Sequence, residues 1–228
     1  MNSTSQEPVS PSAQAGRLAR GILAAAMIVG PLVQVAFPLL QPWPADTDDY
    51  VADVGAHTAA YRALAWLGLL GAVTMAPAVA GLAALAWRGA PRLALAGAVL
   101  AVPGMLNPDG NPDDLVYAAA RAGAADDETR AMLDRLGELP PFTTFGFYAF
   151  GVAFAVGGLL LGAAVLIGRT APRWAAVALL AASCVALLGS YVPIGAAAAT
   201  AGWAVASAGF IGCAVALLRQ RDTRTPAS

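Results

Sequence analysis

Four side chains in two polar stretches have the chemistry to bind a metal ion or to transfer protons. Asp53 and His57 are four residues apart, and so are Asp134 and Glu138, so each pair would share one face of a helix. Three carboxylates and one imidazole can hold a transition-metal ion or act as acid and base. Charged side chains also belong at the solvated ends of helices, and His57 is the only histidine of the chain. Two interpretations are therefore open: a functional site and a solvated surface.

No recognised catalytic motif accompanies these residues. The sequence contains no Walker motif, G-x-S-x-G elbow, C-x-x-C or H-E-x-x-H. It also has no basic stripe that would follow a phosphate backbone, which excludes nucleic acid as a partner on electrostatic grounds. The sequence identifies no cofactor, and it leaves open whether the protein is an enzyme.

The composition is that of an integral membrane protein. Of 228 residues, 58% are hydrophobic and 12% charged, with a mean hydropathy of +0.65, whereas soluble domains carry roughly a quarter charged residues. This excludes a disordered chain, which needs high charge and low hydrophobicity. Two cysteines in the whole chain exclude a disulfide-stapled mini-protein.

Six apolar stretches predict an all-α fold, a polytopic membrane bundle of six transmembrane helices. A helix needs about 20 residues to cross a ~30 Å hydrocarbon core, and we expect every stretch except the short third one to meet that length. The stretches are Gly21–Leu40, Ala63–Trp87, Leu93–Leu106, Phe142–Ile167, Trp174–Val192 and Ala199–Leu218. No Asp, Glu, Arg or His lies in the core of any stretch, which argues against an ion-coupled carrier.

The connecting segments alternate in charge. One set holds nine arginines and two acidic residues, and the other holds twelve acidic residues and four arginines. Arginine-rich segments stay on the cytoplasmic side of membranes. Six spans with both termini in the cytoplasm satisfy this rule at every loop, whereas five spans would break it at one. We therefore expect a multi-pass protein of the cell membrane, surrounded by the lipid bilayer.

The polar ends and the apolar part between them divide the chain into three segments. We predict a disordered cytoplasmic tail over 1–16, a six-helix membrane domain over 17–218 and a second cytoplasmic tail over 219–228. The first apolar run is longer than the core of a signal peptide and no A-x-A site follows it, which favours an uncleaved anchor. Two acidic outer loops, 41–61 and 107–141, belong to the membrane domain.

Both outer loops contain helix signals. Acidic residues at 46–49 favour a helix start, and the helix can continue from Asp48 into the second span without a break. The residues on one face of it are then Asp49, Asp53, His57 and Tyr61. In the second loop, Asn111 is a suitable helix cap with Pro112 behind it, and another helix is expected to begin at 126–128. This loop should pack on the membrane surface or cover the mouth of the bundle.

The motifs RGAPR at 88–92 and RTAPR at 169–173 indicate an internal repeat. Each lies between two spans. The two motifs are 81 residues apart, and the same separation relates Asp53 to Asp134 and His57 to Glu138. Spans two and three would then recur as spans four and five, running the same way through the membrane, as in membrane proteins built from parallel repeats. The alternative explanation for the matching residues is chance, because Ala and Gly are frequent throughout the chain. Gly158 and Gly162 predict close helix packing in the fourth span, with self-association as the alternative.

The overall pattern resembles a group of uncharacterised six-span bacterial membrane proteins, commonly found in actinobacteria. The features that carry the likeness are the acidic loop before the second span, the two RxAPR turns, and the stretch ELPPFTTFGFYAFGVAFAVGGLLLGAAVL followed by APRW. The likeness covers about residues 17–218. It implies the six-span plan and assigns no role to any residue.

Three functions from different classes fit these observations. The leading one is non-enzymatic binding of a lipid, a small apolar molecule or a partner protein of the membrane. The second is a membrane-embedded enzyme that uses Asp53, His57, Asp134 and Glu138, with or without a metal ion, and the third is a passive transporter. An enzyme requires the two pairs to converge beside a pocket, binding requires an apolar groove without converging acids, and a transporter requires a continuous polar path.

Overall fold

The computed structural model describes residues 11–40, 47–106, 112–138, 150–189 and 195–220, which form helices and turns without any strand. The helices are α1 (Pro11–Leu40), α2 (Thr47–Ala56), α3 (Thr58–Trp87), α4 (Pro91–Leu106), α5 (Pro112–Ala122), α6 (Asp126–Gly137), α7 (Phe150–Gly168), α8 (Arg173–Gly189) and α9 (Ala196–Arg219). The prediction of an all-α protein is therefore confirmed for the described residues.

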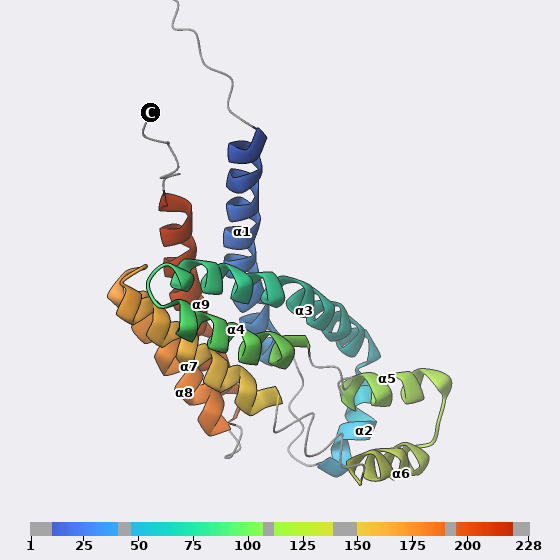
Figure 1. Ribbon diagram of the computed structural model, residues 1–228. Helices are drawn as coiled ribbons and strands as arrows, with labels where there is room; N and C mark the ends of the chain where they lie inside the picture. Colours follow the sequence, from blue (N-terminus) through green and yellow to red (C-terminus); the bar gives the residue numbers. More distant parts are fainter. Residues whose placement is uncertain (1–10, 41–46, 107–111, 139–149, 190–194, 221–228) are drawn as a thin grey trace, which may run out of the picture.

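Six of these helices are apolar and pack around one another in a closed order. Helix α1 packs against α3 and α9, α3 against α4, α4 against α7, α7 against α8, and α8 against α9. Helix α3 also reaches α7 and α9, so the six helices share one core. Helices α1 and α9 lie side by side and project beyond the others at one end (Figure 1).

The apolar helices differ in length. Four are long enough to cross a membrane: Gln14–Leu40, Thr58–Trp87, Gly151–Gly168 and Ala196–Arg219. The short third span is confirmed, since the apolar part of α4 covers only Pro91–Gly104. The predicted fifth span, Trp174–Val192, is described only as far as Gly189, where α8 has 17 residues and rises about 26 Å. Residues 190–192 lie outside the described part, as do 142–149 of the fourth span.

Helix α1 extends beyond the predicted first span. It begins at Pro11, so residues 11–16 of the predicted tail over 1–16 lie in this helix. Arg20 links this extension to the other end of the chain, because its Nη1 donates to the backbone oxygen of Gln220, the C-cap of α9, at 2.6 Å. A guanidinium in this position satisfies a carbonyl group that has no partner within the helix.

The bundle is apolar both inside and outside. Its core contains Met27, Met75, Leu82, Leu85 and Leu161, all almost completely buried. Large apolar side chains also cover the outer surface. They include Trp66, Leu69, Val73, Val99, Ile167 and Leu188. A surface of this kind is an aggregation hazard in water, whereas lipid tails accommodate it. The four long apolar helices and this surface together indicate a membrane protein.

The short helices α2, α5 and α6 form a small cluster at the start of α3 (Figure 1). The buried side chains of this cluster are Val51, Val54, Tyr61, Leu64 and Val116. Both helix starts predicted in the second loop are confirmed, at Pro112 and at Asp126, while the cap Asn111 lies outside the described residues. The described parts of the two acidic loops thus pack on each other and on the first turns of α3.

Close backbone contacts join the helices of the bundle. A Cβ on Gly157 would lie 2.6 Å from the backbone nitrogen of Ala101, and one on Gly97 would lie 2.9 Å from the carbonyl oxygen of Gly157. Helices α4 and α7 therefore touch along their backbones, as small residues permit in membranes. Gly158 and Gly162 face α8, which confirms their predicted role in close packing.

The two arginine turns meet at a pair of glycines. Gly89 lies in the RGAPR turn and Gly168 directly precedes the RTAPR turn, and a Cβ on either glycine would overlap the backbone of the other. The turns differ in conformation, because Arg88 is helical with φ −66° whereas Arg169 has φ 51°. The similar sequences thus lie side by side without adopting the same turn.

We expect Gly89→Ala to lower the free energy of unfolding by about 1–3 kcal/mol, because the added methyl group forces the two turns apart. Thermal unfolding of the detergent-purified variant measures this effect. Gly21→Ala in α1 is the matched control, since nothing lies within 4 Å of a Cβ at that glycine. Identical unfolding of Gly89→Ala and the wild type would contradict the close contact of the turns.

Candidate functional site

The predicted unbroken helix from Asp48 into the second span is wrong, because the chain breaks at His57. Helix α2 ends at Ala56 and α3 begins at Thr58, with His57 as its N-cap. His57 has φ −115° and ψ 34°, which is outside the helical region. The physical cause is tertiary packing, since α2 lies against α5 and α6 instead of extending α3 (Figure 1).

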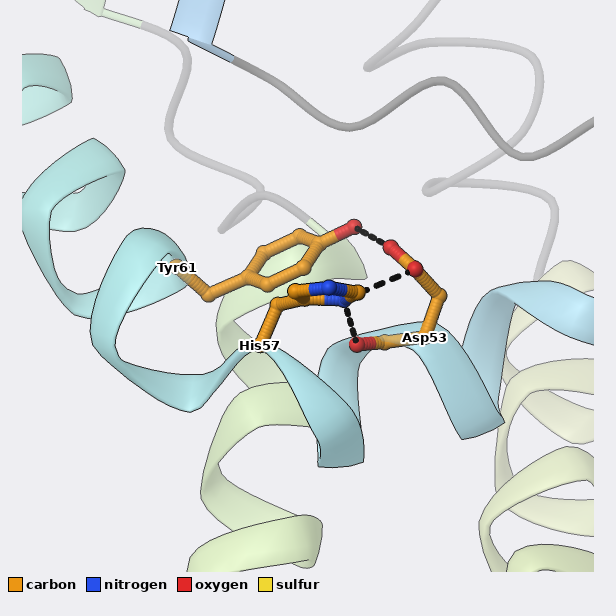
Figure 2. Close-up of polar contacts among 3 residues, drawn as sticks. All are labelled: Asp53, His57 and Tyr61. Atoms are coloured by element: carbon orange, nitrogen blue, oxygen red, sulfur yellow. Dashed lines mark hydrogen bonds and ion pairs between the residues drawn. The ribbon is translucent and has the colours of Figure 1, made fainter.

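Three residues of the predicted face meet across this break. Figure 2 shows Nδ1 of His57 beside Asp53, at 2.9 Å from Oδ1 and 3.1 Å from the backbone oxygen. The hydroxyl group of Tyr61 donates to Oδ2 of the same aspartate at 3.2 Å. The Asp53 carboxylate at the end of α2 thus holds the first residue before α3 and a residue in its first turn. The side chain of Asp49, the fourth member of the face, lies outside the described part.

The three side chains differ in their exposure to solvent. The side chain of His57 is 57% exposed and that of Asp53 is 22% exposed, while Tyr61 is buried in the core of the α2–α5–α6 cluster. A carboxylate that orients an imidazole through one nitrogen leaves the other nitrogen for proton transfer. The same contacts also fasten α2 to α3, so the arrangement supports both a chemical and a structural role.

The second candidate pair lies at the end of α6, with Asp134 in the helix and Glu138 directly after its last residue. Asp134 and Glu138 are exposed, and the amide of Glu138 donates to the carbonyl oxygen of Asp134 at 3.1 Å, so the two are one helical turn apart as predicted. Within the described ranges, no three His, Cys, Asp or Glu residues gather closely enough to hold a metal ion. The two pairs therefore do not form one ligand set there, and the metal site stays a prediction.

Since a single pair supplies only two ligands, we expect the detergent-purified protein to contain less than one equivalent of any transition metal. Elemental mass spectrometry of the wild type beside His57→Ala tests this. A stoichiometric metal ion in the wild type that disappears in His57→Ala would contradict the expectation and would establish His57 as a ligand.

The contact between Tyr61 and Asp53 should stabilise the junction of α2 and α3. Removing the hydroxyl group with Tyr61→Phe is expected to lower the free energy of unfolding by about 1–2 kcal/mol, because a hydrogen bond to a charged group is lost. Tyr117→Phe is the matched control, since Tyr117 packs against the same cluster. Chemical unfolding in detergent gives both values, and equal losses would show that the Tyr61 hydrogen bond contributes nothing.

A cavity of about 110 Å³ lies among α3, α4, α7, α8 and α9. Phe154 of α7 and Trp203 of α9 stack on its wall with their ring centroids 6.0 Å apart. Among the described residues that line it, only the hydroxyl group of Ser183 and the indole N–H of Trp203 are polar, and none is ionisable. The interior of the bundle therefore offers an apolar site with two hydrogen-bonding groups.

Small residues leave the space for this cavity. Ala182 on α8, together with Gly202 and Ala206 on α9, lines it with little side-chain volume. The sequence alone does not single out these positions, because Gly and Ala at other places bring helices into direct contact. Gly157, for example, faces α4 without a gap, whereas Ala182 and Ala206 line the cavity. Only the three-dimensional arrangement distinguishes the two outcomes.

No protein-family model, curated protein or solved structure matches the chain. A function therefore has to be inferred from physical features of the molecule itself. Two such features are available: the Asp53–His57–Tyr61 contact at the start of α3, and the apolar cavity inside the bundle.

Proposed function

We propose that the protein is a membrane protein that binds a small apolar molecule, or the acyl chain of a lipid, in the cavity among α3, α4, α7, α8 and α9. The observation that carries this proposal is the apolar lining, which has two polar groups and no ionisable one among the described residues. An apolar cavity of roughly 150 Å³ stays dry and takes up benzene. The volume of about 110 Å³ suits one ring or a short segment of a hydrocarbon chain.

In the proposed topology, the protein crosses the cell membrane six times and has both termini in the cytoplasm. Support comes from the alternating loop charges and from the Arg20 contact, which brings the ends of α1 and α9 together. Helices α4 and α8 are short, and local thinning of the bilayer accommodates spans of this kind. The adjacent arginine turns favour the proposed repeat of α3–α4 as α7–α8, and the six-span plan agrees with the bacterial proteins that the sequence resembles.

Two features favour binding over the other functions. The enzyme hypothesis required the Asp53–His57 and Asp134–Glu138 pairs to converge, and in the described part of the chain they do not form one cluster. The transporter hypothesis required a continuous polar path, whereas the cavity has only the Ser183 hydroxyl and the Trp203 N–H as polar groups among its described lining residues. Binding without chemistry makes neither demand.

A photoreactive fatty acid tests the proposed binding site. We expect a diazirine-bearing C16 fatty acid, added to the purified protein, to label Trp203 and Phe210 in the cavity wall. Ala182→Leu fills part of the space and should lower this labelling about tenfold, which corresponds to about 1.4 kcal/mol of binding free energy. Ala181→Leu is the matched control, because Ala182 is buried at the cavity and Ala181 is exposed on the outside of α8.

Two results would contradict the proposal. One is labelling confined to exposed residues on the lipid-facing surface, such as Leu188. The other is equal labelling of Trp203 in Ala182→Leu and Ala181→Leu. Either result would show that the fatty acid contacts the outside of the protein and does not enter the bundle.

A further inference from the structure

A second pocket lies at the arginine-rich end of the bundle, between the α7–α8 turn and the last turn of α9. Its volume is about 320 Å³. Arg169 and Thr170 line it from the turn, and Arg219 and Gln220 line it from the end of α9. None of its described lining residues is acidic. The pocket therefore combines two positive charges with space for a bound group.

The two arginines are available to a ligand. Both are exposed, and among the described residues neither Arg169 nor Arg219 makes a side-chain hydrogen bond or an ion pair. Arg20 is the contrasting case, because its guanidinium is engaged by the backbone of Gln220. Guanidinium groups bind phosphate through parallel N–H donors, so a pair of them at one pocket favours a phosphate group.

Arg169 occupies a backbone position that favours glycine. The amide of Arg169 donates to Leu166 O at 3.3 Å and that of Thr170 donates to Val165 O at 3.3 Å, which is the Schellman pattern at the end of α7. The residue in the left-handed conformation is Arg169, with φ 51°. Glycine would adopt this conformation without strain. The arginine side chain at this position therefore calls for a reason other than the turn.

Thr170 supplies an independent sign of a missing partner. Its Oγ1 is buried and has no hydrogen-bond partner among the described residues, although buried polar groups are nearly always paired. The same threonine lines the pocket beside Arg169. A ligand oxygen bound there would give the hydroxyl group its partner.

We propose that this pocket binds the phosphate group of an anionic phospholipid. The phosphate would lie between Arg169 and Arg219 with the Thr170 hydroxyl as a further donor, next to the N-terminus of α8, which also favours an anion. A lipid is favoured as the source, because Gly212 and Val215 continue the pocket along a helix that is long enough to cross a membrane. Basic pockets between such helices bind lipid headgroups. The site is independent of the central cavity.

Native mass spectrometry of the full chain in detergent, titrated with phosphatidylglycerol, tests this site. We expect the double variant Arg169→Gly with Arg219→Gln to bind this lipid about tenfold more weakly than the wild type, which is the loss of about 1.4 kcal/mol. Arg88→Gln is the matched control: Arg88 holds the equivalent place in the RGAPR turn and does not line the pocket. Its affinity should equal that of the wild type.

Two further measurements separate binding from folding. Arg169→Gly relieves the left-handed arginine, and Thr170→Val removes a buried hydroxyl group without a described partner, so both variants should unfold at or above the wild-type temperature while binding less phosphatidylglycerol. An unchanged affinity in Thr170→Val and in the double variant would overturn the proposal. So would an equal loss in Arg88→Gln, because the effect would then be general charge.

Inorganic phosphate distinguishes a lipid headgroup from a soluble anion. We expect inorganic phosphate at the concentration of the lipid to leave phosphatidylglycerol bound, because the apolar part of the pocket contacts only the lipid. Displacement that depends on Arg169 and Arg219 would overturn the assignment to a lipid and would identify a site for free phosphate.

Discussion

The structure depends on how closely its helices can approach one another. Apolar helices gain nothing from leaving lipid for each other, so they associate through van der Waals contacts that small residues make possible. Gly97 and Gly157 bring α4 against α7. Gly209 brings α9 against α8 in the same way, since a Cβ on this glycine would lie 2.9 Å from the carbonyl oxygen of Ala175. These contacts set the order of the six helices, and that order brings the α3–α4 and α7–α8 turns together at one end of the bundle.

The central cavity also results from small residues. It lies where larger neighbouring side chains keep the helices apart and the small residues do not fill the space between them. Phe154, Trp203 and Phe210 lie around it, and the alanines between them are too small to fill the remaining volume. Unfilled apolar space beside a packed wall forfeits the van der Waals contacts that an occupant would make. An apolar occupant regains these contacts, which links the packing of the bundle to its proposed function.

Hydropathy and charge predicted the all-α class, the short third span and the helix starts at Pro112 and Asp126, because these features depend on local sequence. The spacing of Asp53, His57 and Tyr61 predicted that they share one face, whereas the hydrogen bond between Tyr61 and Asp53 forms across the break of the helix at His57. That break arises from packing of α2 on α5 and α6, which no local pattern encodes. The two pockets were not predictable for the same reason, since each is lined by residues from distant parts of the chain.

The two ends of the bundle use charge in opposite ways. At the end with α2, α5 and α6, the Asp53 carboxylate is occupied by His57 and Tyr61 and joins two helices. At the arginine-rich end, Arg169 and Arg219 line an open pocket and make no described side-chain hydrogen bond or ion pair. A charge satisfied within the protein stabilises its fold, whereas a charge left at a pocket is available for a ligand. The Asp53–His57 contact joins two helices whatever else it does, and the proposed binding role falls to a turn that composition alone would describe as a topology signal.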